Sequence, residues 1–171
     1  EGPMLSLKNV NAFSHFTDWT IAHVHIGALG WNGFLTFGML YFLIPKLFNV
    51  KLFSQKLANT HFWLGTLGIL FYAVPLYWAA VTQNQMWREF TPEGYLAYPN
   101  FLETITQIIP MYIARAFGGL LYIVGVVLMI INLAKTIKIG KFSNNDEVEI
   151  SYEPFGKEPR KKGESGHRWL E

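Results

Sequence analysis

The chain has 171 residues, of which 51% are hydrophobic and none is cysteine, and its formal net charge is +2. Charge is unevenly spread: positions 137–171 hold seven basic and seven acidic residues, whereas the stretch 19–83 has only Lys46, Lys51 and Lys56. So long a stretch with so little charge excludes a conventional soluble domain, and the balanced charge argues against nucleic acid as a partner. The lack of cysteine excludes disulfides, thiolate zinc sites, iron–sulfur clusters and c-type haem attachment.

The hydrophobic pattern predicts an all-α fold, an integral membrane bundle of three transmembrane helices, because about 20 mainly apolar residues cross a bilayer. The spans are expected at 19–44, 57–81 and 105–137. Pro45 is expected to end the first span, Pro75 to kink the second and Pro110 to mark the first turn of the third. A soluble all-helical core is the alternative. Glycines in all three spans suit close packing against a helix or a cofactor: Gly27, Gly30, Gly33, Gly65, Gly68, Gly118 and Gly119.

The loops predict an orientation. Three lysines and no acid lie between the first two spans, and Lys135, Lys138 and Lys141 come at the end of the third, whereas the 84–104 loop holds one arginine and three glutamates. Because lysine-rich loops face the cytoplasm, the 84–104 loop and the segment 1–18 are expected outside. The polar, charged tail 138–171 is then a cytoplasmic linker, and we expect no specific role for its His167.

Two histidines, His23 and His25, lie inside the first span, where ionisable side chains indicate function by default. Residues two apart on an α-helix point to nearly opposite sides, since each residue turns the helix by about 100°. One metal ion therefore does not suit the pair, whereas two cofactors flanking the helix do, and imidazole is the usual axial ligand of haem iron. The alternative is that both rings bond neighbouring helices.

Arg115 is charged in the outer half of the third span, where a guanidinium could pair with the two propionates of a haem. The alternative is an arginine that reaches out of the membrane or bonds backbone carbonyls. Asp18 and His15 could hold propionates or an ion at the outer surface, or belong to a helix cap with solvated neighbours. His61, near the cytoplasmic end of the second span, is expected to make a structural hydrogen bond.

Four runs of residues resemble a known family: 1–8, 12–31, 61–69 and 112–121. The run Ala12-Phe-Ser-His-Phe-Thr-Asp-Trp-Thr-Ile-Ala-His-Val-His, continuing to Trp31, resembles the haem-binding helix of subunit I of cbb3-type cytochrome c oxidases. The resemblance covers residues 1–137 and implies the last three of about twelve helices. Glu rather than Met at position 1 agrees with a piece of a longer polypeptide, and the end of the tail is similar to the start of the family's next subunit.

By this resemblance, His23 would be the proximal ligand of the high-spin haem b3, and His25 an axial ligand of the low-spin haem b. Arg115 would neutralise propionates, with His15 and Asp18 near them on the outer side. The second ligand of the low-spin haem, the three histidine ligands of copper and the redox-active tyrosine would lie outside this chain, so the chain alone should not reduce oxygen.

The implied activity is transfer of electrons from cytochrome c through c-type haem subunits to oxygen, which becomes water with proton pumping. The implied partners are the other helices of subunit I and the c-type haem subunits, in the inner membrane of a bacterium. Two other functions stay open: a di-haem b-type electron carrier or nitric oxide reductase-like subunit, and a non-enzymatic scaffold.

Overall fold

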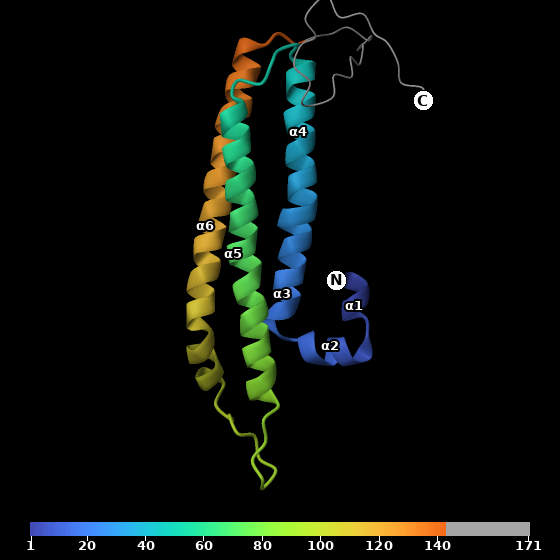
Figure 1. Ribbon diagram of the computed structural model, residues 1–171, viewed down its shortest axis with the longest axis vertical. Coiled ribbons are helices and arrows are strands. Elements are labelled where there is room, and N and C mark those ends of the chain that lie inside the picture. Colours follow the sequence, from blue (N-terminus) through green and yellow to red (C-terminus); the bar gives the residue numbers. More distant parts are fainter. Residues whose placement is uncertain (143–171) are drawn as a thin grey trace, which may run out of the picture.

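The computed structural model describes residues 1–142, which form helices and connecting loops without any β-strand. Two short helices, α1 (Gly2–Leu5) and α2 (Lys8–Ser14), precede three long ones (Figure 1). The first long helix is continuous from Asp18 to Leu47 and consists of α3 (Asp18–His25), η1 (Ile26–Gly33) and α4 (Phe34–Leu47). The others are α5 (Gln55–Trp87) and α6 (Phe101–Ile139).

The long helices contain 30, 33 and 39 residues and are apolar enough to cross a bilayer. This confirms the predicted fold class of an all-α membrane bundle, and the chain is a multi-pass membrane protein. The tail from residue 143 onward, with His167, lies outside the described residues.

The helices extend beyond the approximate spans expected from the sequence. Pro45 lies inside α4, which ends two residues later, and α5 continues six residues past the expected end at position 81. The third helix begins at Phe101, so Pro110 lies well inside α6 and not in its first turn. The side chain of Asn100 caps this helix by accepting a hydrogen bond from the amide of Leu102 (3.0 Å), which fixes the earlier start.

A π-helix interrupts the first span directly after the histidine pair. Its eight residues, Ile26–Gly33, include three glycines, and the wider backbone spiral is of the kind often found at functional sites. The Tyr122 hydroxyl of α6 donates a hydrogen bond to the carbonyl of Leu29 (3.0 Å). A Cβ at Gly33 would lie 2.6 Å from that hydroxyl, so the tyrosine fits against η1 only because residue 33 is glycine.

Helices α5 and α6 form the most extensive contact in the bundle, and α3 packs against α5 beside them (Figure 1). The contact is closest at Gly68 and Gly118. A Cβ at Gly118 would lie 2.6 Å from the carbonyl oxygen of Gly68 and from the amide nitrogen of Tyr72. These two glycines therefore serve helix packing, as small residues do between membrane helices.

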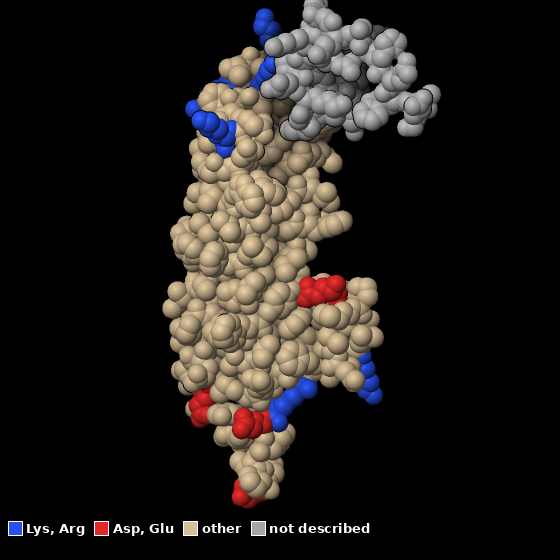
Figure 2. Space-filling model, in the orientation of Figure 1, with Lys and Arg blue, Asp and Glu red and all other residues tan. Residues whose placement is uncertain are grey.

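Charged side chains gather at the ends of the bundle. Figure 2 shows basic residues at the end where α6 terminates, both acidic and basic residues toward the opposite end, and a largely uncharged surface between them. Backbone and side-chain hydrogen bonds join the 48–54 loop to the end of α6: Lys141 N to Phe48 O (2.9 Å) and Phe53 N to Thr136 Oγ1 (3.0 Å). Lysines on both sides of that loop are thereby held at one end.

Candidate functional site

His25 ends α3, and its ring is oriented by its own helix. Its Nδ1 lies 2.8 Å from the carbonyl oxygen of Ile21, one turn earlier. Since a carbonyl only accepts, Nδ1 carries the proton and Nε2 presents a lone pair. The ring also lies against Tyr72 of α5, with centroids 4.7 Å apart and planes tilted by 32°. An imidazole held in this way is prepared to ligate a metal through Nε2.

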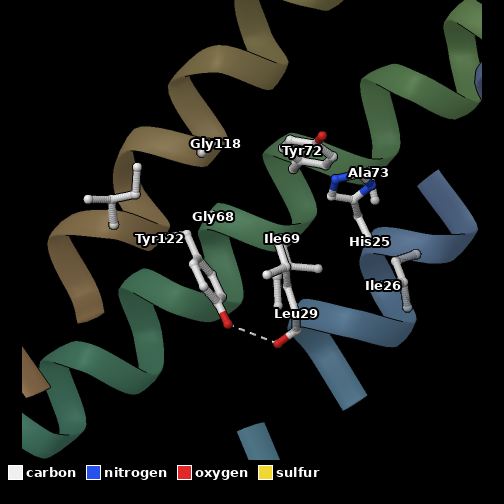
Figure 3. Close-up of a pocket in the computed structure, with 11 residues that line it drawn as sticks. His25, Ile26, Leu29, Gly68, Ile69, Tyr72, Ala73, Gly118 and Tyr122 are labelled. Carbon is white, nitrogen blue, oxygen red and sulfur yellow. Dashed lines mark hydrogen bonds between the residues drawn. The ribbon is translucent and has the colours of Figure 1, made fainter. Parts of the chain in front are cut away.

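The His25 ring faces an open cavity of about 320 Å³ that is lined by three helices (Figure 3). Apolar and small residues of η1, α5 and α6 line the rest of it: Ile26, Leu29, Gly68, Ile69, Tyr72, Ala73, Gly118, Gly119, Tyr122 and Ile123. An added Cβ at Gly119 would meet no atom within 4 Å, so this glycine leaves space in the cavity and does not serve helix contact. An apolar cavity with one available imidazole nitrogen fits a flat, iron-containing macrocycle.

His23 points away from that cavity, toward the N-terminal segment. Its Nδ1 lies 3.1 Å from a carboxylate oxygen of Glu1, and 35% of its side chain is exposed. The carboxylate orients this imidazole as the Ile21 carbonyl orients that of His25, and again Nε2 stays available. The two rings thus serve different sides of one helix, in agreement with the angular argument from the sequence.

Glu1 is a candidate site residue that the sequence analysis missed. Its carboxylate also accepts hydrogen bonds from the Trp19 indole (2.8 Å) and the Tyr77 hydroxyl (2.8 Å). Burial raises the pKa of this carboxyl, but the hydrogen bonds from Tyr77, His23 and Trp19 outweigh it, and the pKa lies below its ordinary value. The available signal was an acidic residue upstream of the helix predicted to bind haem. Only the fold, which returns α1 toward α3, brings this carboxylate to His23.

Arg115 lies between two tyrosine rings. Its guanidinium carbon is 4.8 Å from the ring centre of Tyr112 and 5.8 Å from that of Tyr72, the ring that packs on His25. Within residues 1–142 no carboxylate forms a salt bridge with it. The guanidinium therefore stands next to the His25 cavity with its hydrogen-bond donors available, as pairing with a carboxylate of a bound group requires.

Asp18 is buried, with 4% of its surface exposed, and it is the first residue of α3 and not its cap. Thr17 caps α3, while one carboxylate oxygen of Asp18 accepts from Gln83 Nε2 (2.9 Å) and from the Tyr112 hydroxyl (2.8 Å). The backbone amide of Asp18 donates to Gln83 Oε1 (2.8 Å), which closes a two-way pair with α5. Asp18 thus joins α3 to α5 and α6 and holds the tyrosine beside Arg115.

The two other histidines among residues 1–142, His15 and His61, are not brought to this site. His15 is exposed on the turn before α3 and packs only on the ring of Phe16. His61 is buried, and its Nδ1 lies 3.3 Å from the Tyr41 hydroxyl, as the predicted structural hydrogen bond requires. Among residues 1–142, no three histidine or acidic side chains come close enough to hold a metal ion together.

Comparison with known proteins identifies relatives of this bundle. The family described as cytochrome c and quinol oxidase polypeptide I matches residues 1–121. A cytochrome c oxidase subunit 1 homolog of Agrobacterium tumefaciens is 51% identical over 138 residues, which are 80% of this chain and 25% of that protein. The cbb3-type cytochrome c oxidase subunit CcoN1 of Stutzerimonas stutzeri is 41% identical over 147 residues, 85% of this chain and 31% of the relative.

A more distant relative, one of the subunits of nitric oxide reductase from Stutzerimonas stutzeri, is 25% identical over 130 residues, 74% of this chain and 27% of that protein. The chain thus spans about a quarter to a third of the length of these relatives.

Proposed function

Because the chain belongs to the cytochrome c and quinol oxidase polypeptide I family, we propose that it is the haem-binding part of a cbb3-type oxidase that reduces oxygen to water with electrons from cytochrome c. The observation that carries this proposal is the histidine pair on α3. Each imidazole has Nδ1 engaged by an acceptor and Nε2 available, and the two rings serve opposite sides of the helix.

We assign His25 as an axial ligand of the low-spin haem b and His23 as the proximal ligand of the high-spin haem b3. A haem, if bound here, would supply a redox-active iron, and each imidazole would hold one such iron through Nε2. The Ile21 carbonyl and the Glu1 carboxylate keep the two rings in the ligating tautomer and raise their basicity. Arg115 would pair with the propionates, while Asp18 would act indirectly by holding Tyr112 beside Arg115.

In this proposal the rest of the assembly supplies the second haem ligand, the ligands of copper and the c-type haems. The assembly lies in the inner membrane of a bacterium, with the 84–104 loop outside and the lysine-rich end in the cytoplasm. Identities of 41–51% to oxidase subunits, against 25% to the nitric oxide reductase relative, favour the oxidase over the reductase. A di-haem carrier would lack copper in the purified assembly.

The test is substitution in the intact oxidase followed by absorption spectroscopy of the reduced enzyme. His25→Ala should remove the low-spin haem signal and spare the high-spin one, whereas His23→Ala should do the reverse. Val24→Ala is a matched control, because Val24 lies between the two histidines with an exposed side chain, and both signals should stay. Retention of both haems in both histidine variants would refute the ligand assignment.

A further inference from the structure

The lysine-rich end of the bundle contains a cleft that the candidate haem site does not use, and we propose that it binds the headgroup of an anionic phospholipid. The cleft has a volume of about 330 Å³ and lies between α4, the 48–54 loop and the first turn of α5. Its lining residues are Tyr41, Pro45, Lys51, Leu52, Gln55 and Ala58. This proposal requires a membrane-spanning chain but does not depend on haem ligation by either histidine.

The charge at this end is of one sign within the described residues. Six lysines lie around the cleft or on the neighbouring end of α6: Lys46, Lys51, Lys56, Lys135, Lys138 and Lys141. The segments 35–83 and 104–142 contain no Asp or Glu, so neither segment supplies a carboxylate to neutralise them. Figure 2 shows this basic end above the uncharged belt. Basic pockets between membrane helices at this level favour anionic headgroups.

The cleft offers three kinds of donor to a phosphate: the Lys51 ammonium, the Gln55 amide and the Tyr41 hydroxyl. Gln55 is the first residue of α5, a helix of 33 residues whose amino-terminal end adds partial positive charge. With no carboxylate in its lining, the cleft does not suit a divalent cation. Its chemistry selects a phosphate-bearing anion.

The Tyr41 side chain, which lines the cleft, contacts the imidazole of His61 through its hydroxyl. His61 is 3% exposed, its Nδ1 lies 3.3 Å from the Tyr41 oxygen, and its buried Nε2 has no hydrogen-bond partner within the described part of the chain. An unpaired buried acceptor is easier to tolerate than an unpaired buried N–H, which favours the proton on Nδ1. The imidazole then donates to the phenol oxygen, beside which the Asn132 side chain also lies, and the Tyr41 O–H can donate to a ligand in the cleft.

A lipid fits this location better than a soluble phosphate because exposed apolar side chains flank the cleft. Phe42, Leu47 and Phe53 are 45–54% exposed. The Lys46 ammonium lies 4.0 Å from the Phe42 ring centre and that of Lys135 lies 4.6 Å from the Phe53 ring centre. Ammonium groups beside exposed rings are typical of the membrane interface. A phospholipid would place its phosphate among the donors and its acyl chains along the rings.

The test uses the full chain in vesicles of equal parts phosphatidylglycerol and phosphatidylcholine, extracted in mild detergent, with the retained lipid counted by native mass spectrometry. Phosphatidylglycerol should be retained in preference to phosphatidylcholine. Lys51→Gln and Tyr41→Phe should each lower its retention about fivefold. Lys51→Arg, which keeps the charge, should retain it. Lys8→Gln removes a lysine near the opposite end and should leave retention unchanged.

Three results would overturn the proposal. The first is equal retention of the two lipids by the unaltered chain. The second is unchanged retention in Tyr41→Phe, a variant that removes only one hydroxyl, when its circular dichroism matches that of the unaltered chain. The third is displacement of phosphatidylglycerol by millimolar inorganic phosphate at constant ionic strength, which would identify a site for soluble anions instead.

Discussion

Substitution of Gly118 by alanine tests whether the contact of α5 with α6 determines both stability and the shape of the candidate haem site. The added Cβ would lie 2.6 Å from two backbone atoms of α5, whereas ordinary contact begins at 3.4 Å. Backbone atoms cannot turn aside as a flexible side chain can, so the two helices must move apart. Overpacking of this kind costs about 1–3 kcal/mol.

The matched control is Gly38→Ala, because an added Cβ at Gly38 in α4 meets nothing within 4 Å. Alanine is favoured over glycine inside a helix by up to ~1 kcal/mol. Both variants gain this helix-propensity energy, so the difference between their free energies of unfolding reports the cost of the clash at Gly118. Circular dichroism of the full chain during unfolding in detergent should show Gly118→Ala less stable than Gly38→Ala by about 1–3 kcal/mol. Equal midpoints for the two variants would refute the close-contact argument.

Two further variants test the residues around the histidines. Asp18→Ala leaves the buried Gln83 amide and the Tyr112 hydroxyl without their acceptor and should cost roughly 1–3 kcal/mol in the same unfolding assay. The exposed His15→Ala should stay within about 0.5 kcal/mol of the unaltered chain, and similar losses for both would contradict the role of Asp18. In the intact oxidase, Glu1→Gln should lower haem retention at His23 about tenfold, because the ring loses a charged acceptor. Equal loss at His25 would show that the carboxylate acts on the whole bundle.

The sequence was sufficient for the features set by local pattern. Long apolar runs with sparse charge gave the three spans, because hydrophobic length is what a bilayer requires. The two-residue spacing of His23 and His25 gave their divergent directions, because both precede the π-helix and lie on regular α-helix. Capping residues determine where a helix begins. The Asn100 cap starts α6 before the expected hydrophobic boundary, so Pro110 lies inside the helix.

Features that depend on contacts between distant segments could not be predicted. The π-helix is held by Tyr122, 93 positions after the carbonyl it binds, and nothing in the local run Ile26–Gly33 specifies that partner. Asp18 was expected to hold propionates or an ion, or to belong to a helix cap, and its actual partner Gln83 is 65 residues away. In both cases the missing information is which polar group of another helix lies at the same depth.

The two histidines differ in how their orientation is secured, and this difference has a functional consequence. His25 is held by a carbonyl of its own helix, so it keeps its direction wherever α3 is helical. His23 is held by Glu1, which belongs to a separate segment and is itself fixed by Trp19 and Tyr77. A disturbance of α1 therefore reaches His23 and leaves His25 in place. If His23 carries the oxygen-reducing haem, the N-terminal segment acts on that centre alone through a single carboxylate.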